Sequence, residues 1–164
     1  MTDSPIPHRT NLMLSVPYVQ QEHPHWCGPA ALLMALEFFG VEKTQSGLAS
    51  LLKTTEAEGT GEDMMEIIAR DLGFDVRTGS GTYDEIVAAI GEGSPVIVAF
   101  IEPKKDEGHY AVVIDANSDR IKLLDPEQSA KPQVVLSKEA FVKRWGSKYT
   151  AQHQWFMTIK PQKR

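Results

Sequence analysis

The sequence has one cysteine among 164 residues, so the chain can form no internal disulfide and no zinc site built on several thiolates. It has no run of about 20 apolar residues, the length that a membrane-spanning helix needs, and its first residues lack the basic and apolar segments of a secretion signal. Its 17 Lys and Arg are outnumbered by 22 Asp and Glu, which argues against binding to nucleic acid or to an anionic membrane. Because a free thiol persists in a reducing compartment, we expect a cytoplasmic protein.

The length and composition are those of one globular domain. Apolar residues make up 41% of the chain and charged residues 24%, and 164 residues are enough to bury a core. We expect residues 1–14 to form an extended N-terminal lead-in and residues 15–164 to form a single domain, with a short edge strand over residues 16–19. Nothing in the composition favours a particular oligomeric state.

The first half of the chain has the apolar spacing and the end signals of helices. Pro29 suits a first helical turn, where its missing N–H is not needed, and Gly40 and Gly73 suit the position after a helix end. Thr82 is expected to cap a further helix through its side-chain oxygen. These signals predict helices over residues 28–39, 45–53, 62–72 and 83–91.

The second half of the chain is rich in β-branched apolar runs, which are typical of strands. A turn signal at residues 117–119 joins two of these runs into an antiparallel hairpin. The runs predict strands over residues 95–101, 109–115, 120–124 and 154–159, with a helix over residues 138–145 capped by Ser137. This order indicates an α+β fold, in which an N-terminal helical half packs on an antiparallel sheet.

Cys27 lies immediately before Gly28 and Pro29, at the start of the first predicted helix. A thiol there meets the positive end of the helix dipole and the unpaired N–H groups of the first turn, and both favour the nucleophilic thiolate. We expect Gly28, which has no Cβ, to leave room for a substrate carbonyl beside the sulfur. Considered alone, Cys27 could instead be a buried cysteine that acts as a small apolar residue.

His109 begins one strand of the predicted hairpin, and Asp125 ends the neighbouring strand. Because the two strands run in opposite directions, these ends lie side by side. His109 can then take the thiol proton and return it to a leaving group, while the Asp125 carboxylate orients the imidazole. Considered alone, His109 could be a histidine at a sheet edge, and Asp125, which precedes Pro126, could start a turn.

Gln21 lies six residues before Cys27. Its side-chain amide can donate a hydrogen bond to the oxyanion that forms on attack, beside the main-chain N–H of Cys27. Gln20 is adjacent and could be the donor instead.

The remaining candidates concern the substrate and a metal. We expect Trp26, Gly28 and Gly108 to contact the substrate, with Trp26 on the rim of the cleft. His23 and His25 have a spacing that could suit a metal, but a metal would need a third ligand nearby. We therefore expect no metal site and no cofactor.

Three segments together resemble the C39 family of papain-like cysteine peptidases. They are Gln21 followed after five residues by Cys27-Gly28-Pro29-Ala30-Ala31-Leu32, then Gly108-His109-Tyr110-Ala111-Val112-Val113, then Leu124-Asp125-Pro126. The resemblance covers about residues 15–128 and implies a papain-like fold and cleavage of a peptide bond. The best-known members remove leader peptides after a Gly-Gly pair and are fused to membrane exporters. This sequence has neither transmembrane segments nor an exporter's phosphate-binding loop, so we expect a stand-alone C39-like domain.

We therefore expect a cysteine peptidase in which a Cys27–His109–Asp125 triad forms a thioester acyl-enzyme that water resolves. Its partner is a peptide or protein substrate. Two alternatives stay open. One is an acyl or peptidyl transferase on the same triad, with an amine or a thiol in place of water. The other is a catalytically silent domain that binds peptides.

Overall fold

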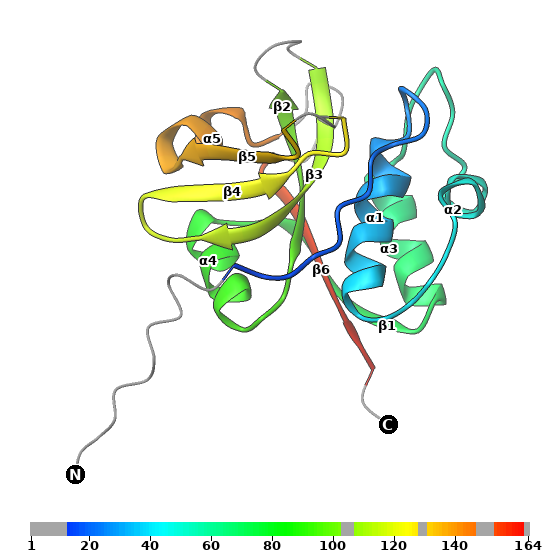
Figure 1. Cartoon of the computed structure of the whole chain (residues 1–164), viewed down its shortest axis with the longest axis horizontal. Helices are drawn as coiled ribbons and strands as arrows, with labels where there is room; N and C mark the ends of the chain where they lie inside the picture. Colours follow the sequence, from blue (N-terminus) through cyan, green and yellow to red (C-terminus); the bar gives the residue numbers. More distant parts are fainter. Residues whose placement is uncertain (1–12, 103–106, 128–130, 147–152, 163–164) are drawn as a thin grey trace.

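The structure, a computed structural model, describes residues 13–102, 107–127, 131–146 and 153–162, so most of the expected lead-in lies outside the described residues. Its centre is a six-stranded antiparallel sheet in the order β1-β6-β2-β3-β4-β5. The strands are β1 (Phe74–Ser80), β2 (Val96–Glu102), β3 (Glu107–Ala116), β4 (Arg120–Leu124), β5 (Gln133–Ser137) and β6 (Trp155–Pro161). The helices are α1 (Cys27–Phe38), α2 (Gln45–Leu51), α3 (Glu62–Asp71), α4 (Tyr83–Gly91) and α5 (Lys138–Arg144). Figure 1 shows α1, α2 and α3 grouped on one side of the molecule and α4 and α5 on the other.

The sheet separates two apolar cores. Along β3, Tyr110, Val112 and Ile114 face the core shared with α1, α2 and α3, whereas Ala111 and Val113 face the core shared with α4 and α5. This alternation follows from the two-residue period of a strand. Both faces of the central strands are therefore buried, as their continuous apolar sequence predicts.

Helix α1 lies in the middle of the first core. Its residues 28–36 are all buried, and the helix packs on β3 and β2. Gly40, at φ 81°, takes the left-handed conformation that ends the helix, as predicted. Within the described ranges no helix is long and apolar enough to cross a bilayer. Because α1 rests on β3, its first residue is held against the sheet.

The ends of the other helices are set by local signals. Thr82 and Glu85 exchange side-chain to main-chain hydrogen bonds before α4, a capping box, and Ser137 caps α5 through the N–H of Ala140 at 3.1 Å. Gly73, at φ 95°, follows α3. The predicted helices are confirmed, and α4 has the predicted bounds.

The edge strand predicted over residues 16–19 is wrong. The main chain there forms no ladder. Residues 13–26, which we call the N-terminal strap, are fixed by isolated bonds: Leu14 N donates to the oxygen of Ile114 at 2.9 Å, and Tyr18 Oη donates to the main-chain oxygen of Asp125 at 2.7 Å. Pro17 has no N–H to contribute, so a continuous ladder is interrupted at its centre.

Two strands, β1 and β5, were not predicted. They occupy the two edges of the sheet, where β1 pairs with β6 alone and β5 pairs with β4 alone. Both strands are half-exposed: β1 carries only two apolar residues, Phe74 and Val76, and β5 carries three but is only five residues long. The signal for a strand is therefore weak in each case. β1 also lies between α3 and α4, so the helical half contributes one strand to the sheet.

Candidate active site

Cys27 is the first residue of α1 and is half-buried. Trp26 takes the N-cap position without a side-chain cap, and the first turn of the helix holds no acidic residue. The positive end of the helix dipole is therefore not neutralised by the helix itself and is available to stabilise negative charge on the sulfur.

His109 and Asp125 form a buried pair. His109 is the third residue of β3 and lies opposite Phe100 of β2. Its exposed fraction is 8% and that of Asp125 is 1%. The Nε2 atom of His109 and the Oδ1 atom of Asp125 are hydrogen-bonded. The structure thus brings these two residues together, as the hairpin predicts, in a place that excludes most water.

The Asp125 carboxylate is held by the chain around it. β4 ends at Leu124, and the next main-chain N–H, that of Asp125, donates to the oxygen of Pro132 at 2.9 Å. The main-chain oxygen of Asp125 accepts the Tyr18 hydroxyl at 2.7 Å, and its Oδ1 also accepts the N–H of Glu127 at 2.9 Å. The carboxylate has little freedom to turn away from the imidazole.

The pKa of His109 depends on both Asp125 and Cys27. Burial lowers the pKa of His109, but side-chain hydrogen bonds to Asp125 and Cys27, and the charges of both groups, raise that pKa well above its ordinary value of 6.5. Because Nε2 is bonded to Asp125, Nδ1 is the nitrogen left to face the Cys27 thiol. The order sulfur, imidazole, carboxylate allows the imidazole to hold the thiol proton and release it.

Gln21 lies on the N-terminal strap, and its main-chain N–H donates to the oxygen of Pro126 at 2.9 Å. Its Nε2 donates to the main-chain oxygens of His23 at 3.0 Å and Pro24 at 2.9 Å, and its Oε1 is buried without a partner among the described residues. Both amide hydrogens are therefore used inside the loop that leads to Cys27. Gln21 can donate to an oxyanion only by releasing one of these bonds.

Gln45 was missed by the sequence reasoning. It is the first residue of α2 and is only 4% exposed. Its Nε2 donates to the main-chain oxygen of Gln20 at 2.7 Å, and its Oε1 accepts the N–H of Glu22 at 3.1 Å. These bonds hold the strap on both sides of Gln21. A glutamine at a helix start carries no signal for such a contact, because its partners lie more than 20 residues away.

The space beside Gly28 is occupied by the protein. A Cβ built on Gly28 would lie 2.4 Å from Oγ1 of Thr60, so the room that we expected for a substrate carbonyl holds this threonine. The hydroxyls of Thr54 and Thr60 are 2.7 Å apart, and the Thr60 main-chain oxygen accepts the Tyr110 hydroxyl at 2.8 Å. Gly28 therefore admits the segment that precedes α3 against the first turn of α1.

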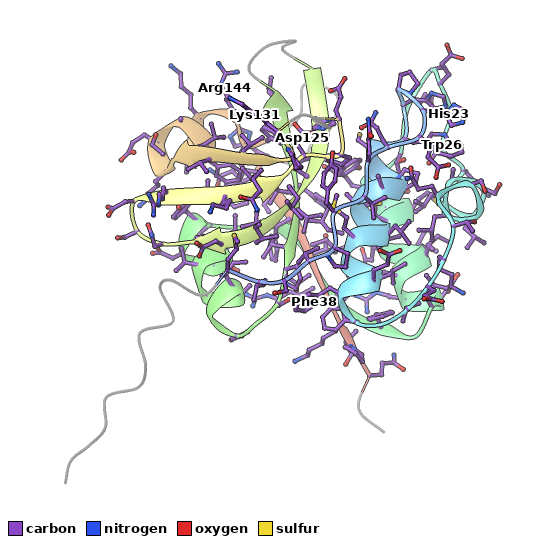
Figure 2. All side chains as sticks on the ribbon, viewed as in Figure 1. His23, Trp26, Phe38, Asp125, Lys131 and Arg144 are labelled. Atoms are coloured by element: carbon purple, nitrogen blue, oxygen red, sulfur yellow. The ribbon has the colours of Figure 1, made fainter. Side chains whose placement is uncertain are left out.

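Trp26 and two histidines form an aromatic rim at the start of α1. The Trp26 ring is 4.2 Å from the His23 ring and 6.2 Å from the His25 ring, centre to centre. Figure 2 shows His23 and Trp26 together where the strap enters the helix, with Asp125 towards the sheet. The two histidines gain no third ligand, since the described part of the chain holds no group of three or more potential metal-binding side chains. Gly108 lies within β3 and directly precedes His109 in the sequence.

The described chain has helices packed on an antiparallel sheet, a cysteine at the start of the central helix, a histidine on β3 and an aspartate directly after β4. This is the papain-like fold of C39 peptidase domains. The chain belongs to the Peptidase_C39 like family, whose model matches residues 13–153. The sequence therefore indicated the family correctly.

Two solved structures illustrate the likeness. The peptidase domain of Streptococcus ComA, a bi-functional ABC transporter involved in a quorum sensing pathway, has a TM-score of 0.73 and 26% identity, covering 89% of this chain and 100% of that one. A double glycine motif protease from an AMS/PCAT transporter, solved in complex with the leader peptide, has a TM-score of 0.72 and 17% identity, covering 93% and 96%. At 17% identity the second likeness shows the fold alone.

Curated relatives are much longer proteins. The chain is 34% identical over 131 residues to the lactococcin-A transport/processing ATP-binding protein LcnC of Lactococcus lactis subsp. lactis. It is 30% identical over 128 residues to the pediocin PA-1 transport/processing ATP-binding protein PedD of Pediococcus acidilactici. Each match covers 78% of this chain but 17% of the relative. The chain thus corresponds to a small part of these proteins.

Proposed function

We propose that this chain is a cysteine peptidase that cleaves a peptide bond through Cys27, His109 and Asp125. The observation that carries the proposal is the buried His109–Asp125 hydrogen bond beside the single thiol of the chain. A histidine with a purely structural role needs only the carboxylate, whereas the second nitrogen of this imidazole faces a thiol at a helix start. Membership of the Peptidase_C39 like family supports the same function.

The first half of the reaction transfers the acyl group to the enzyme. The Cys27 sulfur attacks the carbonyl carbon of the scissile bond, and the carbonyl π electrons move onto oxygen. His109, which holds the thiol proton as imidazolium, gives that proton to the amide nitrogen as the C–N bond breaks. An amine leaves, and a thioester remains on Cys27.

The second half restores the enzyme. Neutral His109 takes a proton from water while the water oxygen attacks the thioester carbon, and the C–S bond then breaks. The acid product leaves, and the sulfur and the imidazolium are paired again. Asp125 keeps the imidazole in one orientation throughout and stabilises its charged form.

The oxyanion needs donors on the side of the sulfur away from His109. We propose that the main-chain N–H of Cys27 supplies one and that the Gln21 amide supplies another. Because the Gln21 amide is bonded to two loop oxygens, the oxyanion must replace one of them as the acceptor. A charged acceptor forms the stronger hydrogen bond, which favours this exchange.

We propose a peptide or a protein segment as the substrate. The curated relatives are transport/processing proteins, and the best-known members of the C39 family cleave leader peptides after a Gly-Gly pair. Peptides that carry a Gly-Gly pair before the scissile bond are therefore the first substrates to test on this chain.

The decisive experiment measures the rate of Cys27 alkylation by iodoacetamide against pH. In the wild type we expect fast alkylation that persists well below the free-thiol pKa of about 8.5, and in His109→Ala we expect this low-pH reactivity to be lost. His153→Ala, which removes an exposed histidine, is the matched control and should behave like the wild type. Slow alkylation that rises only near pH 8.5 in all three proteins would contradict the proposal and favour a silent binding domain.

A further inference from the structure

Glu62 carries a buried carboxylate oxygen without a partner. Its Oε2 is shielded from solvent and receives no hydrogen bond from any described residue. Among these residues, the only other buried side-chain nitrogen or oxygen in this condition is Oε1 of Gln21. A carboxylate oxygen that is buried and unpaired is unfavourable, so a ligand that supplies a donor there binds better than it would on an open surface.

Glu62 lies beside the helix start that carries the proposed nucleophile. It is the first residue of α3 and follows Thr60 by two residues. The Thr60 side chain fills the space beside Gly28, which directly follows Cys27. The Thr60 main-chain oxygen also accepts the hydroxyl of Tyr110 from β3. Residues 60–62 therefore lie beside the first turn of α1, which carries Cys27, and Thr60 also contacts Tyr110 of β3.

The groups that act electrostatically on this region are acidic. Burial, and after it the charge of Asp63, raises the pKa of Glu62 from 4.5 to about 7. Burial, followed by the charges of Glu62, Cys27 and Asp63, raises the pKa of Tyr110 well above 10. No described Lys or Arg forms an ion pair with Glu62. The region around Glu62 and Asp63 therefore repels a further negative charge, and no described Lys or Arg neutralises the Glu62 carboxylate.

We propose that Glu62 binds the ammonium or guanidinium group of a basic residue in the substrate, so that the enzyme prefers peptides with Lys or Arg near the scissile bond. The inference deepens the proposed function and rests on it. A bound cation supplies the missing donor, and its charge offsets the repulsion between Glu62 and Asp63. A metal ion fits less well, because no third histidine, cysteine or carboxylate of the described residues joins these two.

The test uses peptide pairs that differ in one residue. Each peptide carries Gly-Gly before a fluorogenic amine, and one Lys is placed at successive positions N-terminal to that pair, with the neutral analogue norleucine as its partner. Wild type, Glu62→Gln and Glu58→Gln are compared, since Glu58 is an exposed glutamate four residues earlier in the chain. We expect wild type and Glu58→Gln to favour Lys at one or more positions by about tenfold or more in kcat/KM. Glu62→Gln should treat the two peptides alike.

A variant with the opposite charge distinguishes loss of the cation-binding site from loss of folding. Glu62→Lys should prefer a peptide with Glu over one with Lys at the same position, and loss of stability alone cannot produce that reversal. Equal cleavage of Lys and norleucine peptides by the wild type at every position would overturn the inference. So would a Lys preference that survives in Glu62→Gln.

Binding to the inactive variant Cys27→Ala separates this inference from the proposed function. Fluorescence anisotropy of labelled Lys and norleucine peptides is measured with Cys27→Ala and with the double variant Cys27→Ala/Glu62→Gln. A Lys preference that requires Glu62, without any cleavage by the wild type, would uphold the binding site and refute the peptidase. Cleavage without a Lys preference would do the reverse.

Discussion

The side-chain amide of Gln45 holds the main chain on both sides of Gln21. It donates to the oxygen of Gln20 at 2.7 Å and accepts the N–H of Glu22 at 3.1 Å, in the manner of a neighbouring strand. Gln45 is buried on α2, and its bonds fix the strap at the residue proposed to donate to the oxyanion. We therefore regard Gln45 as a positioning residue for Gln21.

Replacing Gln45 by Ala should slow the chemical step more than it weakens substrate binding. A small displacement of Gln21 misplaces an oxyanion donor, so we expect kcat to fall on the order of 10- to 100-fold while KM changes little. The two lost hydrogen bonds should also lower the free energy of unfolding by about 1–3 kcal/mol. Steady-state kinetics and urea denaturation check both effects. Ser46→Ala, at the exposed neighbouring position, should leave both unchanged, and an equal loss there would refute the positioning role.

Replacing Gln21 by Ala should remove the donor itself. We expect kcat to fall by about 10²- to 10³-fold, with the fold retained. Gln20→Ala is the matched control, because Gln20 is exposed and the bond that it makes to Gln45 uses its main-chain oxygen. Kinetics on a Gly-Gly peptide distinguish the two variants. A fall in Gln20→Ala alone would show that Gln20 is the donor.

Asp125→Asn should slow turnover less than His109→Ala does. Asparagine keeps the size of the buried aspartate and an oxygen for the N–H of Glu127, but it cannot stabilise an imidazolium by charge. His109→Ala removes the base altogether. The values of kcat/KM for the two variants give the comparison, with circular dichroism to verify folding. If Asp125→Asn turned over like the wild type, the carboxylate would have no part in orienting the base.

The contribution of His109 to stability should decrease with rising pH. The pKa of His109 is raised in the folded state, since bonds to Asp125 and Cys27 outweigh the effect of burial. Its protonated form therefore stabilises the fold fully below the unfolded pKa of about 6.5, and this contribution is lost as the pH rises through the higher folded pKa. Urea denaturation from pH 5 to 10 should show wild type and His109→Ala converging as the pH rises. A difference that grows above pH 7 would contradict the direction of the shift.

Gly28→Ala should destabilise the protein, because its new Cβ would meet Thr60 Oγ1 at 2.4 Å. We expect a loss of about 1–3 kcal/mol in the free energy of unfolding, with part of it regained when Thr60→Gly is added. Gly91→Ala is the matched control, since a Cβ there meets no atom within 4 Å. Thermal denaturation measures all three. Equal stability of Gly28→Ala and Gly91→Ala would show that Thr60 moves aside easily.

Helices were easier to predict from this sequence than strands. The ends of α1, α3 and α4 depend on residues a few positions away, such as Gly40, Gly73 and Thr82. The residues near β1 in the sequence do not indicate its partner strand, because β1 pairs with β6, about 80 residues further along the chain. The same holds for the strap, whose contacts at Ile114 and Asp125 are distant in sequence.

The candidate site was predictable where it depends on local order. The cysteine precedes Gly-Pro at a helix start, the histidine lies on one strand of a hairpin, and the aspartate directly follows the other strand. The residues next to each of them in the sequence are enough to predict these positions. Gln45, Thr60 and Glu62 were not predicted to join the site. Each approaches it through a turn or a helix start whose position depends on packing of the whole helical half, and no motif in the sequence marks that approach.

The position of β6 in the sheet affects when the protein can fold during its synthesis on the ribosome. This strand, residues 155–161, lies inside the sheet between β1 and β2, although it follows the other described strands in the sequence. A ribosome releases the segments that carry Cys27 and His109 long before it releases β6. Until then β1 has no neighbouring strand, and the core beneath α1 lacks Trp155, Met157 and Ile159. A nascent chain should therefore lack the complete sheet until β6 has been synthesised, so the proposed peptidase can become active only after that point.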